Sequence, residues 1–201
     1  KVLMLTSSVP AEGKSMSAVA LATSFAKLGQ KTLLIDADLR NSRLLTTLDL
    51  PRYNGAGLAG LLSGQSDSID AETTQVEQFG FDFLPIGHTP PNPVELLASA
   101  RFGQLADQAL QHYDQIVVDG PPMLLLSDAV ELSRSVSGIV YVIEANRIKL
   151  RAIENSLNRL EGAGAKVFGA IVTKVPPSSA GYGYGYGYGY GYGYGNAPAE
   201  A

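Results

Sequence analysis

"KVLMLTSSVPAEGKSMS", residues 1–17, joins an apolar run to a short loop and then to the first turn of a helical pattern. Its EGKS segment is the second half of the phosphate-loop pattern G-x-x-x-x-G-K-[ST], in which backbone N–H groups and a helix N-terminus converge on phosphate. We predict that Lys14 reaches the β- and γ-phosphates of a nucleotide and that Ser15 ligates Mg²⁺. Ser8 stands where the pattern has its first glycine, so the alternative is a capped strand-to-helix turn with a surface lysine.

Apolar runs and helical patterns alternate along the rest of the chain. The runs, nearly continuous in Val, Ile and Leu, cover 1–7, 31–38, 81–87, 114–120, 138–145 and 166–174. Apolar residues at helical spacing cover 13–29, 93–113 and 147–164. Continuous apolar runs are typical of strands buried on both faces of a parallel sheet. We therefore predict an α/β fold with a doubly wound, mostly parallel sheet flanked by helices, of the P-loop NTPase type.

Acidic residues follow two of these runs, at the strand ends where such sheets bind ligands. Asp36 and Asp38 in LLIDADLR (33–40) are two residues apart, so on a strand they face the same side. Two neighbouring carboxylates are unfavourable without a cation, although Asp38 as a cap of the next turn is an alternative. Asp119 ends the run QIVVD in the manner of a Walker B strand. Three carboxylates beside a phosphate loop predict a Mg²⁺–nucleotide site.

Composition limits the classes of function. The 201 residues carry a net charge of −4, which gives no support to nucleic-acid binding. They contain no cysteine, which excludes disulfides and thiolate metal sites. No apolar run in the sequence approaches the roughly 20 residues of a membrane-spanning helix. Because the chain starts at Lys1 and enters an apolar run directly, we expect it to be part of a longer protein.

The last residues have a different character. From about Pro176 no pattern is able to form a core, and AGYGYGYGYGYGYGYGN (180–196) alternates glycine with tyrosine. We predict a catalytic domain at 1–178 and a flexible Gly/Tyr-rich tail at 179–201. The tail tyrosines are Tyr182, Tyr184, Tyr186, Tyr188, Tyr190, Tyr192 and Tyr194.

Taken together, these segments resemble the bacterial tyrosine kinases (BY-kinases) of capsule and exopolysaccharide synthesis, within the deviant P-loop ATPases. The resemblance covers nearly the whole chain: residues 6–40, GLAGLLSG (57–64), PPNPVELLAS (90–99), YDQIVVDGPPMLLLSDA (113–129) and the tail. PPNPVELL discriminates best, because the related partition ATPases usually lack it. Those ATPases also carry a signature lysine at the position of Val9, and its absence here favours the kinase branch.

The resemblance implies roles for individual residues. Asp36 is the implied catalytic base for the tyrosine hydroxyl, and Lys14 the implied phosphate contact. Ser15, Asp38 and Asp119 are the implied Mg²⁺ site, with Asp119 acting through water. Arg40 and Arg43 would meet phosphate or a neighbour's acidic surface, or else remain solvated. The family often has asparagine near the adenine, where this chain has Thr173. The implied nucleotide contacts are Pro10, Ala11, Glu12, Gly13, Lys14, Ser15, Met16 and Arg40.

The function that the resemblance implies is an ATP- and Mg²⁺-dependent protein-tyrosine autokinase that phosphorylates tail tyrosines in trans. We expect a homo-oligomeric ring that phosphorylation of the tails releases, because phosphates add like charge. The expected partner is the cytoplasmic segment of a membrane polysaccharide co-polymerase, fused or separate, at the cytoplasmic face of the inner membrane. Alternatives are a partition-type ATPase switch and a non-enzymatic, nucleotide-dependent regulatory module. For the tail, the alternatives are a self-associating low-complexity segment and an engineered extension.

Overall fold

The computed structural model describes residues 1–124 and 127–176, and in this part of the chain seven strands form one sheet. Their spatial order is β3-β4-β2-β5-β1-β6-β7. All neighbouring pairs are parallel except β3–β4, which confirms the predicted doubly wound, mostly parallel sheet. The strands are β1 (Val2–Ser7), β2 (Thr32–Asp36), β3 (Thr74–Val76), β4 (Phe81–Leu84), β5 (Gln115–Asp119), β6 (Gly138–Glu144) and β7 (Val167–Thr173).

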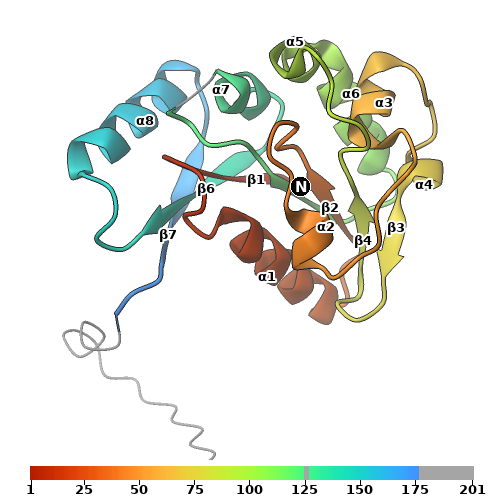
Figure 1. Cartoon of the computed structure of the whole chain (residues 1–201), viewed down its shortest axis with the longest axis horizontal. Helices are drawn as coiled ribbons and strands as arrows, with labels where there is room; N and C mark the ends of the chain where they lie inside the picture. The colour runs from red at the N-terminus through yellow and green to blue at the C-terminus, as the bar shows by residue number, and fades with distance from the viewer. Residues whose placement is uncertain (125–126, 177–201) are drawn as a thin grey trace, which may run out of the picture.

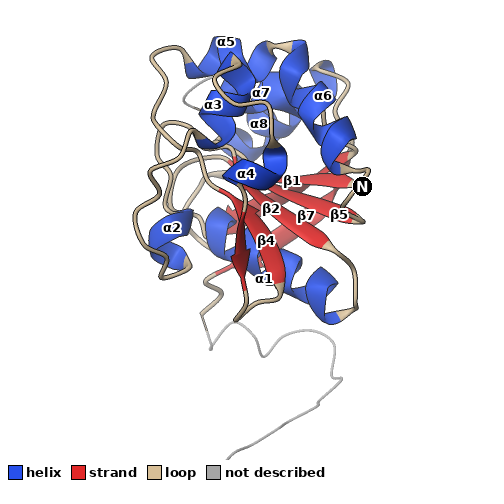
Figure 2. Ribbon diagram, turned by 90° about the vertical axis from the view of Figure 1, so that its right-hand side faces the viewer, coloured by secondary structure: helices blue, strands red, loops and turns tan. Residues whose placement is uncertain are grey.

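Helices cover both faces of the sheet. Figures 1 and 2 show α1 and α2 on one face, and α3, α5, α6, α7 and α8 on the other. The helices are α1 (Lys14–Lys27), α2 (Leu44–Thr47), α3 (Gly57–Ser63), α4 (Ile69–Glu72), α5 (Pro93–Ala98), α6 (Ala100–Ala109), α7 (Asp128–Ser133) and α8 (Leu150–Gly162). Among the described residues, no helix has the length and apolar character that crossing a bilayer requires.

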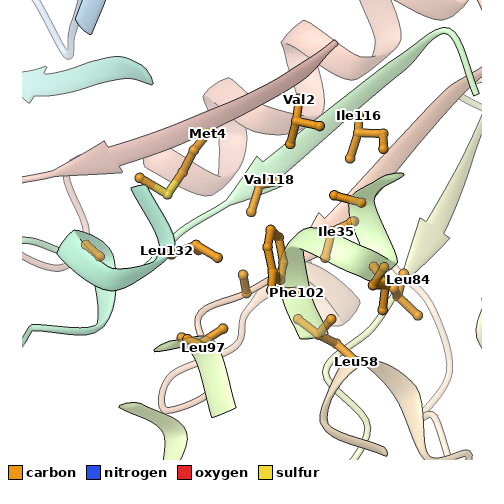
Figure 3. Close-up of a cluster of buried hydrophobic side chains, with 14 of the residues drawn as sticks. Val2, Met4, Ile35, Leu58, Leu84, Leu97, Phe102, Ile116, Val118 and Leu132 are labelled. Carbon is orange, nitrogen blue, oxygen red and sulfur yellow. The ribbon is translucent and has the colours of Figure 1, made fainter. Parts of the chain in front are cut away.

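The two faces bury separate apolar clusters because side chains alternate across each strand. On the α1 face, Ala18 and Ala22 of the helix pack against Leu5, Leu34 and Val117 of the central strands. Small residues at these positions let the helix approach the sheet closely. On the other face, Phe102 of α6 and Leu132 of α7 lie among strand residues such as Met4 and Val118 (Figure 3). These clusters hold β1 and α1, and therefore the loop between them, in a rigid frame.

The structure differs from the prediction in several ways, and the short helices α2, α3, α4 and α7 were not predicted. The helical segment 93–113 breaks at Ser99, which has extended backbone angles and donates its hydroxyl to the Leu96 carbonyl (2.6 Å). Strand β3 was not predicted, because three residues are too short for a pattern to show. The expectation that the run 166–174 is buried is wrong: β7 is exposed along almost its whole length, with Phe168 59% and Val172 55% exposed. It is an edge strand, so neighbours bury it less than the central strands.

Candidate active site

The loop between β1 and α1 has the geometry of an anion site. Gly13 precedes α1 with a left-handed backbone (φ 93°), and Ala11 is also left-handed (φ 66°). The first helical N–H groups have no partner within a helix, so they are free to face a ligand. Ser8 stands where the phosphate-loop pattern has its first glycine, and its hydroxyl shares a buried hydrogen bond with the Tyr141 hydroxyl (2.9 Å). The serine side chain therefore anchors the loop to β6 where the pattern has glycine.

The acidic residues meet because of strand register. Asp36 and Asp119 are direct partners at the ends of β2 and β5, and residues opposite each other on adjacent strands point to the same face. The Lys14 ammonium lies 2.9 Å from Oδ1 of Asp119 and 3.5 Å from Oδ2 of Asp38. The three predicted carboxylates and the phosphate-loop lysine thus form one buried cluster. This arrangement excludes the alternative in which Lys14 is a surface residue.

Burial and the charges of neighbouring residues together set the pKa values in this cluster. It raises the pKa of Asp36 to about 7, with the nearby charge of Asp119 acting in the same direction and the Ser42 hydroxyl opposing it. Burial also raises the pKa of Asp119, although Lys14 and Ser15 act to lower it. For Lys14, burial acts to lower the pKa, but the carboxylates of Asp119 and Asp38 raise it above its ordinary value. The lysine is therefore held charged by the acidic residues.

Asp36 and Asp38 have different surroundings. Asp36 is fully buried, and its oxygens accept the Ser42 hydroxyl (2.6 Å) and the Asp38 N–H (3.3 Å). Asp38 accepts the Asn41 N–H through Oδ1 (3.2 Å) while Oδ2 faces Lys14. Asp38 therefore does cap the next turn, as the alternative held, and faces the lysine at the same time. Of the two, Asp38 is the one that borders open space.

A cavity of about 190 Å³ lies over the phosphate loop. It brings together six of the predicted nucleotide contacts with Asp38 and three residues of the following segment. Its lining is Pro10, Ala11, Gly13, Lys14, Ser15, Met16, Asp38, Asn41, Arg43 and Thr47. A larger hollow of about 380 Å³ is lined by residues of the 61–69 segment and of α6. We assign the candidate site to the smaller cavity because its lining carries the phosphate loop and two members of the charged cluster, Lys14 and Asp38.

Two predicted nucleotide contacts lie elsewhere than the cavity lining. Glu12 is fully buried and points behind the loop, where its carboxylate accepts the N–H groups of Val9 (2.8 Å) and Glu144 (3.2 Å). Arg40 donates from Nε to Oδ2 of Asp128 (2.8 Å). Their assignment as nucleotide contacts stays a prediction, as do the roles of the other site residues. The predicted phosphorylation sites Tyr182–Tyr194 lie outside the described residues.

Sequence reasoning missed two cavity residues, Asn41 and Thr47, and left Arg43 undecided. Neither Asn41 nor Thr47 belongs to a pattern, and both reach the site through the turn after β2 and the short helix α2. The sequence signal that could have pointed to these two residues is their closeness to Asp38 along the chain. Thr173, which stands where the family often has asparagine near the adenine, donates its hydroxyl to the Glu12 carbonyl (2.6 Å). It therefore contacts the phosphate loop itself.

The chain is similar to known nucleotide-binding proteins and kinases. The family model described as the CobQ/CobB/MinD/ParA nucleotide binding domain matches residues 4–182. The Staphylococcus aureus protein described as 'Putative tyrosine-protein kinase CapB' is 39% identical over 179 residues, which cover 88% of this chain and 76% of that protein. Tyrosine-protein kinase CpsD of Streptococcus agalactiae is 38% identical over 186 residues, 90% of this chain and 79% of that protein. The chain belongs to the bacterial tyrosine-protein kinases.

Solved structures of bacterial tyrosine kinases have the same fold. The kinase domain of Escherichia coli tyrosine kinase ETK superposes with a TM-score of 0.80 at 35% identity, covering 92% of this chain and 72% of that one. The family match indicates nucleotide binding somewhere in residues 4–182. In this bacterial tyrosine kinase, the cavity above Gly13 and Lys14 is the candidate nucleotide site.

Proposed function

We propose that this chain is an ATP- and Mg²⁺-dependent protein-tyrosine autokinase whose substrates are its own tail tyrosines. One observation carries the proposal: the phosphate-loop lysine Lys14 is buried against Asp119 and Asp38 beside a cavity lined by the same loop. Phosphoryl transfer needs positioning and charge neutralisation more than covalent help from the protein. The Lys14 ammonium and the free N–H groups at the start of α1 would supply both, together with a cation held by the neighbouring carboxylates.

The donor set of the cavity suits Mg²⁺. Asp38 borders the cavity and Ser15 lines it, and Asp119 lies behind them in contact with Lys14. Carboxylate and hydroxyl oxygens are the ligands that this ion prefers, and it commonly keeps several waters. When bound, Mg²⁺ neutralises charge on the phosphates. Lys14 would hold the β- and γ-phosphates, and Ser15 and Asp38 would hold the metal, with Asp119 reaching it through water.

Asp36 is proposed as the base that receives the tyrosine proton. A base works best when its pKa lies near the working pH, and burial brings that of Asp36 to about 7. The Ser42 hydroxyl occupies Oδ2 of this carboxylate at 2.6 Å. A substrate hydroxyl would approach a remaining lone pair of this carboxylate, or would replace the Ser42 hydroxyl after rotation of the Ser42 side chain.

The tail is well placed in the sequence to be a substrate. Strand β7 ends at Thr173, which contacts the phosphate loop through Glu12, and Tyr182 follows nine residues later. Nine extended residues span about 30 Å. Glycine on both sides of each tyrosine removes steric bulk. The tail therefore has the reach for its own site and for that of a neighbour, and we propose transfer in trans.

Assembly completes the proposal. We propose a homo-oligomeric ring that tail phosphorylation releases, acting with the cytoplasmic segment of a membrane polysaccharide co-polymerase at the inner membrane. Supporting it, β7 exposes Phe168, Ile171 and Val172 and carries no charged side chain. Edge strands of monomeric proteins are usually protected by charges, bulges or short length. An uncharged apolar edge is consistent with coverage by another polypeptide.

A mixing experiment tests both kinase activity and its direction. Lys14→Met protein with an intact tail is incubated with Mg·ATP and active protein truncated after Ser179, and phosphotyrosine is located by mass spectrometry. We expect label on the inactive chain. If wild-type protein becomes phosphorylated but the inactive Lys14→Met chain in the mixture does not, the trans mechanism is contradicted. ATP hydrolysis without phosphotyrosine in wild-type protein would instead favour the partition-type ATPase switch.

A further inference from the structure

Glu12 is a buried carboxylate in the middle of an anion-binding loop. It is 0% exposed, and each of its oxygens accepts a backbone N–H: Oε2 from Val9 at 2.8 Å and Oε1 from Glu144 at 3.2 Å. A carboxylate facing the cavity would repel phosphate. This one is turned to the opposite side of the loop, toward the ends of β6 and β7. It therefore joins a segment near residue 9 to a strand end more than 130 positions away.

Two further contacts support the same part of the loop. Thr173, the last residue of β7, donates its hydroxyl to the Glu12 carbonyl at 2.6 Å. Lys174 donates to the Ala11 carbonyl at 2.8 Å and to Oε2 of Glu144 at 2.9 Å. The loop is thus held from behind at its side chain and at two successive carbonyl groups. These contacts leave the N–H groups at the start of α1 free for a ligand.

The loop needs such support because its backbone is unfavourable. Ala11 has φ 66°, a left-handed conformation that is unfavourable for a residue with a Cβ. Gly13 has φ 93°, and a Cβ built there would lie 3.2 Å from the Thr173 methyl group. A buried carboxylate is tolerated when hydrogen bonds satisfy it, and hydrogen bonds to charged groups are stronger than those between neutral groups. The charge on Glu12 thus strengthens the two contacts that hold the bend.

We propose that Glu12 is a positioning residue: its carboxylate bridges the N–H groups of Val9 and Glu144, its carbonyl accepts the Thr173 hydroxyl, and these contacts together hold the phosphate loop in its anion-binding shape. The inference rests on the proposed nucleotide site and adds a residue that acts on phosphate binding without touching the nucleotide. Its effect belongs to binding, because bound phosphate can restore the loop of a weakened variant at the expense of affinity. The expected signature is therefore a raised KM for ATP with kcat little changed.

The test compares Glu12→Gln with Glu77→Gln. Glutamine keeps the size of the side chain but turns an NH₂ group toward one of the two N–H donors. Glu77 is exposed in the turn between β3 and β4, at the opposite edge of the sheet, so its variant controls for the loss of one negative charge. Mg·ADP affinity is measured by calorimetry, KM and kcat by autophosphorylation, and folding by thermal unfolding.

We expect Glu12→Gln to weaken Mg·ADP binding by about 10- to 100-fold, to raise the KM for ATP similarly, and to leave kcat within a few-fold. Glu77→Gln should match wild type. A folded Glu12→Gln protein with wild-type affinity, or one with lower kcat at unchanged KM, would overturn the proposal. Wild-type protein that fails to bind Mg·ADP would refute the proposed function instead.

A second pair of variants decides the case if Glu12→Gln does not fold. Thr173→Val removes the hydroxyl that supports the Glu12 carbonyl and keeps the branched shape, whereas Thr173→Ser keeps the hydroxyl. We expect weaker Mg·ADP binding in the valine variant and recovery in the serine variant. Equal affinity of the two variants would show that support from β7 does not position the loop, and would overturn the proposal.

Discussion

Replacing Lys14 with methionine should destabilise the nucleotide-free protein as well as abolish its activity. Lys14 is 7% exposed, and its ammonium is the cation in contact with Asp119 and Asp38. Methionine keeps much of the apolar stem and removes the charge, so packing changes little. Removing one partner of a buried ion pair costs about 3–5 kcal/mol, because the other charge stays buried without compensation.

The expected loss of folding stability depends on pH. Without Lys14, the pKa values of Asp36 and Asp119, already raised by burial, should rise further. A carboxyl group whose pKa is raised in the folded state stabilises it at low pH, and this contribution is lost as pH rises through the folded pKa. The Lys14→Met variant should therefore lose more stability at pH 8 than at pH 6. At pH 8 the loss corresponds to a fall in Tm of roughly 6–20 °C for a domain of this size.

The assay is thermal and urea unfolding of wild type, Lys14→Met and Lys27→Met at both pH values, with and without Mg²⁺. Lys27 is an exposed lysine in the last turn of α1, so its loss controls for net charge. Added Mg²⁺ should restore more stability to Lys14→Met than to wild type, because a cation then returns to the carboxylates. A loss below about 1 kcal/mol at pH 8, or an equal loss at both pH values, would refute the reasoning.

Four shorter predictions concern the acidic cluster and the tail. Asp36→Asn should retain Mg·ADP binding but lower phosphotyrosine formation by about 10²–10⁴-fold, and unchanged autophosphorylation would remove Asp36 from the role of base. Asp38→Asn should weaken Mg²⁺-dependent ADP affinity in calorimetry, since a neutral amide is a poorer ligand; wild-type affinity would contradict its assignment to the metal. Because burial raises the pKa of Asp36 from 3.8 to about 7, nucleotide-free protein should lose stability as pH rises over that interval, by at most about 4 kcal/mol, and urea unfolding of Asp36→Asn should show a flatter pH dependence. Replacing several tail tyrosines with glutamate should weaken the oligomer in sedimentation experiments while phenylalanine should not, and equal effects would argue against a charge switch.

Much of the fold and part of the site were readable from local patterns. The apolar runs predicted the strands because a strand buried on both faces needs apolar residues at nearly every position. EGKS (12–15) predicted the strand–loop–helix unit that β1 and α1 form, and Asp36 and Asp119 were recognised because they stand at the ends of such runs. These features depend on a few consecutive residues, so the sequence by itself determined them. The same holds for family membership, which rests on the order of the motifs.

Tertiary structure decided how those residues meet. That Asp36 lies opposite Asp119 depends on the register of two strands that are distant in the chain, and register follows from packing of the whole sheet. That Glu12 turns away from the cavity depends on N–H groups at Val9 and Glu144, and on Thr173 behind the loop. The position of β7 at the sheet edge left an apolar run exposed. Each of these outcomes depends on which distant segments become neighbours, and a pattern of adjacent residues does not contain that information.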